Sequence, residues 1–236
     1  MDARRSPPRV SLRTVTMPLG LRPGISFCEA SGHLVFLDVA TDRYYGLVAS
    51  AEAAFRCLLR ESTQNNHDAC IDQLLEKRLL VDRPDALPIR PCPKTYTATA
   101  SLLDRCLPTV TLIAIVRALA SVMATRFTLR LRGLAVALRT TAARKARVRV
   151  RASDPATIER EVAASHLCAL LVRSHDQCLV RSLALVRRLA VRGERADLVI
   201  GVRVRPFSAH AWVQRDNLLL NDSCDGVRGY TPILIL

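Results

Sequence analysis

Residues 174–193 read SHDQCLVRSLALVRRLAVRG, the pattern of a helix with a polar start and a glycine after its end. Its apolar residues recur at steps of three and four, as on one face of a helix. The pattern places Cys178 in the first turn, where unpaired N–H groups and the helix dipole favour thiolate over thiol. Cys178 is therefore a candidate nucleophile, although a cysteine there also fits the role of a small buried hydrophobic residue.

Two apolar runs after this helix predict a pair of strands. They are residues 198–204 (LVIGVRV) and residues 206–214 (PFSAHAWVQ). Because side chains alternate along a strand, the second run places His210, Trp212 and Gln214 on one face.

The turn after the second run determines which residue lies opposite His210. A three-residue loop at 215–217, with its last residue in the left-handed conformation, pairs Gln214 with Leu218. Continued along the ladder, this register sets His210 opposite Asp222. Each residue alone has a simpler explanation, as a structural histidine and a turn aspartate. Together with a thiol at a helix start, they supply the nucleophile, the base and the orienting carboxylate of a cysteine enzyme.

The first half of the chain has the pattern of a small antiparallel sheet followed by helices. Short runs at 25–29, 33–37 and 43–48 predict three strands separated by polar turns. Apolar residues at helical spacing predict a helix after Ser50 and another around residues 71–79. Three strands followed by helices are typical of a winged-helix-like unit.

Composition divides the chain into four segments. Prolines at four positions between 84 and 93 exclude a helix, so we expect residues 84–98 to form an extended linker. The linker follows a small domain at 17–83 and precedes a larger one at 99–236, and residues 1–16 form a basic, disordered extension. The expected fold class is α+β with two domains.

The second domain also carries helical patterns before Cys178. We expect helices at about 101–124 and 127–146, and a third from Asp154 to about Arg173. The apolar run at 108–124 is interrupted by a charge and is shorter than the roughly 20 residues that span a membrane. It predicts a buried helix and no membrane association.

Composition and charge exclude several classes of protein. The 236 residues are 50% hydrophobic, which excludes a disordered chain, and carry a net charge of +14. Residues 1–98 hold 13 basic and 11 acidic residues, so the small domain has little basic surface for DNA, and we expect no nucleic-acid partner. The first 16 residues lack the apolar run of a secretory signal, so the eight cysteines are expected as free thiols in the cytoplasm.

We expect no cofactor and no metal. The chain has no Gly-x-x-x-x-Gly-Lys loop and no Gly-x-Gly motif that could hold a nucleotide phosphate. His166 and Cys168, and likewise His175 and Cys178, stand close in sequence, but no second cysteine pair follows at zinc-finger spacing.

Four short segments resemble proteins of bacterial lasso-peptide biosynthesis. DQCLVRSLALVRRL, PFSAHAWVQ and LNDS, in this order, resemble the transglutaminase-like cysteine peptidases that remove leader peptides. HLVFLDVATDRYYGL resembles the leader-recognition domain of the same systems, a winged-helix relative of the small chaperone-like protein of pyrroloquinoline quinone synthesis. The resemblances cover about residues 17–90 and 155–236, and the motif around His210 is the most specific part.

The resemblance implies a papain-like transglutaminase fold for the second domain and a role for each matching residue. Cys178 would be the nucleophile, His210 the general base and acid, and Asp222 the orienting carboxylate. Trp212 matches the tryptophan that stands beside the histidine in that family.

The resemblance also implies a precursor peptide whose leader pairs, as an added strand, with the open edge of the small sheet. The candidate contact residues, which fit a core equally well, are Tyr44, Tyr45, Leu47, Leu75 and Leu79. An ATP-dependent macrolactam synthetase would then take the freed core, and the basic stretch at 126–151 is a candidate surface for that partner. Two alternatives stay open: acyl or amide transfer by the same three residues, or a protein without catalysis that delivers the precursor or binds DNA.

Overall fold

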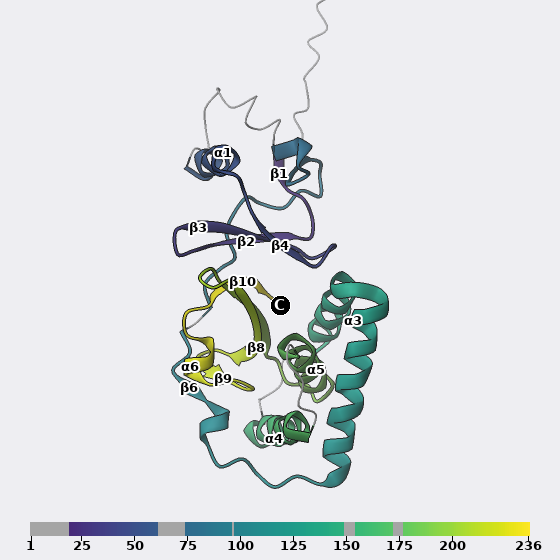
Figure 1. Ribbon diagram of the computed structural model, residues 1–236. Helices are drawn as coiled ribbons and strands as arrows, with labels where there is room; N and C mark the ends of the chain where they lie inside the picture. The colour runs from purple at the N-terminus through teal and green to yellow at the C-terminus, as the bar shows by residue number, and fades with distance from the viewer. Residues whose placement is uncertain (1–18, 61–73, 96, 149–153, 172–176) are drawn as a thin grey trace, which may run out of the picture.

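The structure, a computed structural model, consists of a small upper part and a larger lower part in contact with each other (Figure 1). It describes residues 19–60, 74–95, 97–148, 154–171 and 177–236. The expected basic extension at 1–16 lies outside the described residues.

The upper part contains the three strands and the helix that the sequence predicts. They are β2 (Ile25–Ala30), β3 (His33–Asp38), β4 (Arg43–Gly46) and α1 (Ala49–Arg60). The strands are antiparallel in the order β2-β3-β4, so β4 is an edge strand. A second, two-stranded sheet, β1 (Leu19–Leu21) with β5 (Leu80–Asp82), has no counterpart in the expected elements.

Side chains of the three-stranded sheet alternate between two hydrophobic cores. Phe27 and Phe36 face α1, with their ring centroids 5.4 Å apart. Val35 and Leu37 face the opposite way and belong to the same core as Ile233 of the larger part. The small sheet is therefore covered on both faces, and the two parts of the chain share one core.

The proline-rich segment is extended, as expected, and is attached to the small sheets. Leu87 exchanges two backbone hydrogen bonds with Leu21, each 2.8 Å long. The N–H of Cys92 donates to the carbonyl oxygen of Phe27 at 2.7 Å. The segment thus lies against β2 and leaves β4 as the other edge of its sheet.

The lower part contains a five-stranded sheet in the order β10-β7-β8-β9-β6. Its strands are β6 (Ala100–Ser101), β7 (Asp197–Arg203), β8 (Ser208–Arg215), β9 (Leu218–Leu219) and β10 (Thr231–Ile235). A 3₁₀ turn, η1 (Leu102–Asp104), follows β6, and a four-residue helix, α6 (Cys224–Val227), lies between β9 and β10. The two predicted runs are β7 and β8, and the second begins at Ser208, after the turn that contains Pro206.

Three helices cover this sheet: α3 (Leu112–Ala146), α4 (Pro155–Leu171) and α5 (Cys178–Val191). Helix α5 lies between the sheet and α3 (Figure 1). The predicted helix at 101–124 begins too early, because α3 starts only at Leu112 and the 3₁₀ turn η1 precedes it. The hydroxyl of Thr111 caps α3 by accepting the N–H of Ala114. The predicted break between 124 and 127 is also wrong. The helix bends at Gly133, where φ is 74° and a glycine avoids the strain of a Cβ.

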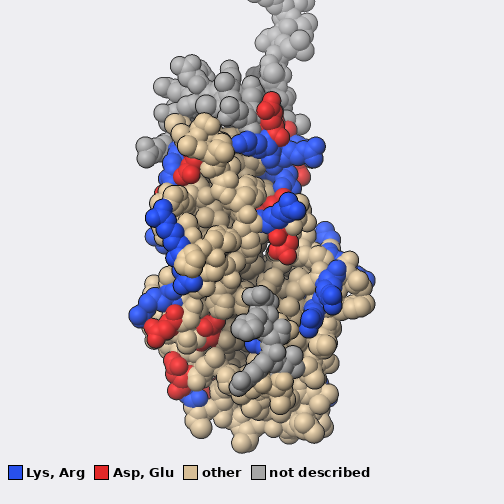
Figure 2. Space-filling view, viewed as in Figure 1, with Lys and Arg blue, Asp and Glu red and all other residues tan. Residues whose placement is uncertain are grey.

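The expectation that the apolar run at 108–124 is buried is wrong. Within this run Leu112, Ile113 and Val116 are 73%, 64% and 55% exposed. Phe127 and Leu131, which follow on the same helix, are exposed as well. The lower end of the molecule, where α3 begins near α4, is mostly tan in Figure 2. Among the described helices, α3 alone is long and apolar enough to cross a membrane, and 17% of its most apolar window is buried.

This exposure predicts how α3 tolerates a charge. The Phe127→Lys substitution should change the free energy of unfolding by no more than about 0.5 kcal/mol, because the exposed ring buries little apolar surface in the folded protein. Val122, on the packed face and 6% exposed, is the matched control, and its replacement by lysine should cost at least about 2 kcal/mol. Urea denaturation measures both values, and equal losses would contradict the exposed face.

Candidate active site

Cys178 is the first residue of α5, as the sequence pattern predicts. The preceding Gln177 makes no side-chain capping hydrogen bond, so the first N–H groups of the helix are not satisfied by a cap. The helix is fixed by its apolar face, on which Leu183, Val186 and Leu189 are buried in the shared core. The thiol therefore stands on a rigid element, at the positive end of its dipole.

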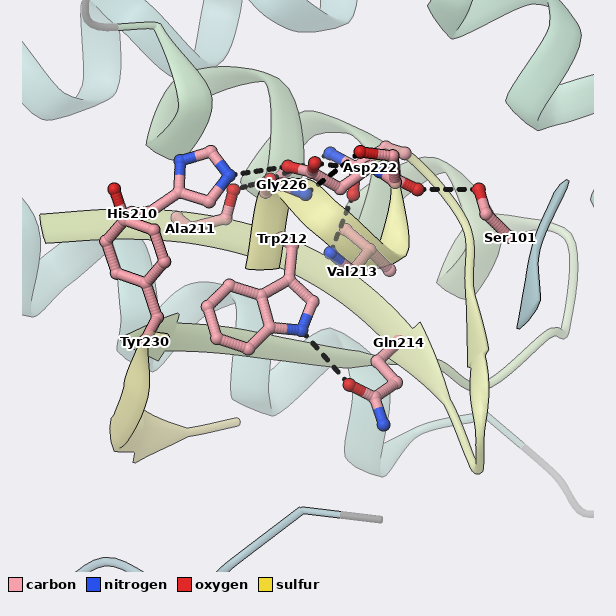
Figure 3. A network of polar contacts seen from close by, with 12 residues as sticks. Ser101, His210, Ala211, Trp212, Val213, Gln214, Asp222, Gly226 and Tyr230 are labelled. Atoms are coloured by element: carbon pink, nitrogen blue, oxygen red, sulfur yellow. Dashed lines mark hydrogen bonds and ion pairs between the residues drawn. The ribbon is translucent and has the colours of Figure 1, made fainter. Parts of the chain in front are cut away.

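Cys178, His210 and Asp222 form a chain of polar contacts. The ring nitrogen Nε2 of His210 lies 2.5 Å from Oδ2 of Asp222. His210 is also hydrogen-bonded to the Cys178 thiol. Because Nε2 faces the carboxylate, Nδ1 is the ring nitrogen left for the sulfur. Figure 3 shows the imidazole above β8 with Asp222 beside it.

The hairpin that connects the two residues differs from the predicted one. Gln214 pairs with Leu219 instead of Leu218, and the loop has two residues, with Asp216 at a φ of 52°. The predicted three-residue loop and its register are therefore wrong. Strand β9 ends at Leu219, and the chain then turns, so Asp222 reaches His210 from this turn and not from a ladder position.

Hydrogen bonds from distant elements hold this turn in place. The Asn221 side chain accepts the N–H of Val213 at 2.7 Å and donates to Oγ of Ser182 on α5 at 2.9 Å. Oγ of Ser101 donates to the carbonyl oxygen of Asp222 at 2.6 Å. Asn221, Ser182 and Ser101 were not among the sequence candidates, since each looks like an ordinary polar residue of a turn or a helix.

The carboxylate of Asp222 is also restrained from the side opposite His210. Its Oδ1 accepts the N–H of Ser223 at 2.8 Å. A Cβ placed on Gly226 would come within 2.2 Å of the same oxygen, so only glycine fits there without moving the carboxylate.

Aromatic side chains pack beside the imidazole. His210, Trp212 and Gln214 share one face of β8, as strand alternation predicts (Figure 3). The Trp212 ring is 3% exposed, lies 6.1 Å from the His210 ring and donates its N–H to Oε1 of Gln214 at 3.1 Å. Tyr230, which was not a candidate, lies 5.3 Å from the His210 ring on another side. These rings limit the positions that the imidazole can adopt.

The pKa of the Cys178 thiol is lowered. Burial by itself raises this pKa, but hydrogen bonds from His210 and from the backbone N–H groups of Ala211 and Leu179 outweigh the burial. Other cysteines shift the opposite way: burial raises the pKa of Cys28 to about 12 and that of Cys92 to about 11. Cys178 thus differs from these two cysteines because its hydrogen bonds lower the pKa of its thiol.

The pKa of His210 is raised to about 10. The hydrogen bond to Asp222 is the largest cause, the hydrogen bond to Cys178 is the second, and burial opposes both. The lowered pKa of the thiol and the raised pKa of the imidazole both favour a thiolate next to an imidazolium, the state in which a cysteine is nucleophilic.

These shifts predict the pH dependence of alkylation. Because the pKa of the Cys178 thiol is lowered, its rate of reaction with iodoacetamide should be higher at pH 7 than that of an unperturbed cysteine and should rise less than tenfold per pH unit between about pH 7 and pH 9. The partly exposed Cys92, whose pKa is about 11, should react slowly across this range and serves as the internal control. Peptide mapping after timed labelling measures both rates. A Cys178 rate that rises about tenfold per pH unit would contradict the ion pair.

The five candidate leader-binding residues belong to two different hydrophobic cores, one on each side of the small sheet. Tyr45, Leu47 and Leu75 pack partly buried against the core under α1, and Leu79 is 1% exposed within that core. Tyr44 points the other way, toward the core that Cys178 also contacts.

Tyr44 lies close to the candidate nucleophile. Its ring centroid is 5.7 Å from that of Phe207, in the turn before β8. Burial, followed by the negative charges of Asp42 and Cys178, raises the pKa of Tyr44 to about 12. Of the five candidates, Tyr44 is therefore the one whose surroundings include Cys178.

Comparison with known proteins agrees with this geometry. Residues 121–235 match the model of the Transglutaminase-like superfamily. The match covers α3 from Ser121 onward, the helices α4 and α5, β7 to β10 and all three residues of the polar chain. It confirms the expected α+β fold with a transglutaminase-like domain.

One curated protein is similar to part of the chain. The Microcin J25-processing protein McjB of Escherichia coli is 46% identical over 48 residues, which are 20% of this chain and 23% of that protein. The matched segment thus spans about a quarter of the curated relative. No solved structure matches the chain significantly.

Proposed function

We propose that this protein binds the leader of a ribosomally made lasso-peptide precursor and hydrolyses the bond between leader and core. The observation that carries the proposal is the contact chain from Cys178 through His210 to Asp222, with a lowered thiol pKa. The partial similarity to a Microcin J25-processing protein supports the substrate class. The reaction takes place in the cytoplasm and uses no metal or cofactor.

In the first step, the Cys178 thiolate attacks the carbonyl carbon of the leader's last residue. The new C–S bond makes a tetrahedral oxyanion, which backbone N–H groups in the first turn of α5 stabilise. His210 gives its Nδ1 proton to the leaving nitrogen, the C–N bond breaks, and the core departs with a free amine. A thioester between the leader and Cys178 remains.

In the second step, water releases the leader. The neutral His210 takes a proton from water, whose oxygen attacks the thioester carbonyl, and the C–S bond breaks. The products are the leader's carboxylic acid, which releases its proton to solvent, and the original thiolate–imidazolium pair. Asp222 accepts the hydrogen bond from Nε2 and stabilises the imidazolium in both steps.

The leader is held by strand addition at β4. This strand pairs with β3 on one side, and the described residues place no strand on its other side. Backbone pairing at such an edge supplies affinity, and side-chain pockets supply selectivity. Tyr45, Leu47 and Leu75, which pack with Leu79 against the core under α1, are the proposed contacts on one side of β4. Tyr44 is the proposed contact nearest Cys178, and Trp212 supports the site by packing beside His210.

The Tyr44→Ala substitution tests this path. It should weaken binding of a fluorescently labelled leader peptide about tenfold, because a large aromatic contact beside the site is lost. Val48→Ala, just beyond β4 and 60% exposed in the wild type, is the control and should leave the dissociation constant unchanged. Fluorescence anisotropy measures both, and equal affinity of the two variants would place the leader elsewhere.

The freed core amine is the substrate expected of an ATP-dependent macrolactam synthetase, which we propose as the protein partner. The basic stretch at 126–151 contains no acidic residue and is the proposed contact surface. Charge of one sign favours encounter with an acidic partner surface.

The test of the function is the intact mass of the precursor peptide encoded beside this gene, after incubation with the protein in H₂¹⁸O. Hydrolysis gives two fragments and places one ¹⁸O in the leader's new carboxylate. A leader joined to an added amine, without ¹⁸O, would show acyl transfer instead. An unchanged precursor that stays bound to the protein, also when the synthetase is present, would reduce the role to delivery.

A further inference from the structure

A cavity of about 320 Å³ lies between α3, α4 and α5, and it is separate from the residues that surround Cys178. Its size is at the lower end of the range for small-molecule sites. Five arginines line it with one glutamate: Arg117 and Arg144 of α3, Glu161 of α4, and Arg187, Arg188 and Arg192 of α5.

The glutamate is already used by two of the arginines. Oε1 of Glu161 lies 2.9 Å from Nε of Arg192, and its Oε2 is paired with Arg188. Glu161 is 5% exposed, so this triad is a buried element of the packing between α4 and α5. The triad leaves Nε of Arg188 buried without a hydrogen-bond acceptor among the described residues.

Arg187 is a buried cation without a negative partner. It is 8% exposed, and its guanidinium donates only to neutral oxygens, among them Oγ1 of Thr141 at 2.8 Å and the carbonyl oxygen of Ala137 at 3.0 Å. Within the described part of the chain no carboxylate lies at ion-pair distance from it. Burial and the nearby charge of Arg144 lower the pKa of Arg187. A buried charge without a counter-charge is costly, which indicates that an anion belongs in this cavity.

The remaining arginines strengthen the positive field. Arg117 and Arg144 line the cavity and have no acidic neighbour on α3, since the chain has no Asp or Glu from residue 105 to residue 153. Five positive charges face one negative charge that is already shared. A single carboxylate cannot balance this excess, whereas a phosphate-type anion carries several charges and matches the planar fork of guanidinium groups.

We propose that the cavity between α3, α4 and α5 is a binding site for a small polyphosphate anion. The Arg187 guanidinium forms the base of the site, and Arg117 and Arg144 close it from the α3 side. Helix α5 carries Cys178 at its first residue and lines the cavity near its C-terminal end. A bound anion therefore restrains the end of α5 that lies away from Cys178.

Pyrophosphate is the probe, and binding is measured without any peptide substrate. Thermal unfolding of the full chain should shift to higher temperature with saturable dependence on pyrophosphate, as expected for a ligand of the folded state. Sodium chloride at matched ionic strength should not reproduce the shift. Isothermal titration calorimetry supplies the dissociation constant.

Arg144→Gln and Arg117→Gln should each weaken pyrophosphate binding about tenfold or more, since each removes a charge-assisted hydrogen bond. Both side chains belong to exposed residues, so the variants are expected to fold. Arg139→Gln, an exposed arginine of α3 outside the cavity, is the control and should bind like the wild type. Equal weakening in all three variants, or a chloride effect of the same size, would overturn the site. Citrate binding as tightly as pyrophosphate would overturn the phosphate class.

Discussion

Replacing Cys178 by alanine is expected to lower the rate of leader cleavage by about 10⁴-fold or more. The sulfur forms the bond to the substrate carbonyl carbon. Without it, no nucleophile remains beside His210 among the described residues. The polar chain of His210 and Asp222 survives in the variant, so binding of the leader should not change. Intact-mass spectrometry of the precursor over time measures the rate, and fluorescence anisotropy of the labelled leader measures the affinity.

Cys224 provides the matched control for this substitution. It lies two residues from Asp222, at the first residue of the short helix α6, and it could be mistaken for a second catalytic thiol. The Cys224→Ala variant should cleave the precursor at the wild-type rate. Loss of cleavage in Cys224→Ala, with activity retained in Cys178→Ala, would assign the reaction to the other thiol.

The parts of the site that follow from local periodicity could be predicted from the sequence. The start of α5 at Cys178 follows from the spacing of apolar residues and from Gly193, whose φ of 84° fits the position after a helix. The shared face of His210 and Trp212 follows from strand alternation alone. The three strands of the small sheet could be predicted as well, because polar turns separate their short runs in the sequence.

The parts that depend on single turns or distant contacts could not be predicted. The register of the hairpin depends on Asp216, which takes the positive φ that the prediction gave to the last loop residue. Ser101 reaches Asp222 from 121 positions away, and no local pattern marks such a contact. The exposed face of α3 was missed because apolar composition does not reveal which side of a helix has a packing partner.

Replacing Asp222 by asparagine is expected to lower kcat/KM for leader cleavage by about 10²- to 10⁴-fold. Asparagine preserves the shape of the side chain and removes the charge that stabilises the imidazolium. Asp225→Asn is the matched control, since Asp225 lies three residues further on, is exposed and, among the described residues, forms an ion pair with Arg228 at 3.4 Å. That variant should retain wild-type activity, and a similar loss in both variants would indicate a general charge effect at this loop.

The pH profile distinguishes the proposed role of Asp222 from a merely structural one. In the wild type, His210 keeps its proton until about pH 10, so cleavage should decline only as the pH approaches that value. The hydrogen bond to Asp222 is the largest cause of the raised pKa, so Asp222→Asn should move the alkaline decline to lower pH. The free energy of unfolding should depend on pH in the same direction. The stabilisation from protonated His210 is complete below the ordinary histidine pKa of about 6.5 and is lost as the pH rises through the raised pKa of about 10 in the folded protein. A variant that loses activity equally at every pH would show that Asp222 only holds the loop, whereas a decline displaced toward neutral pH ties the carboxylate to the protonation of His210.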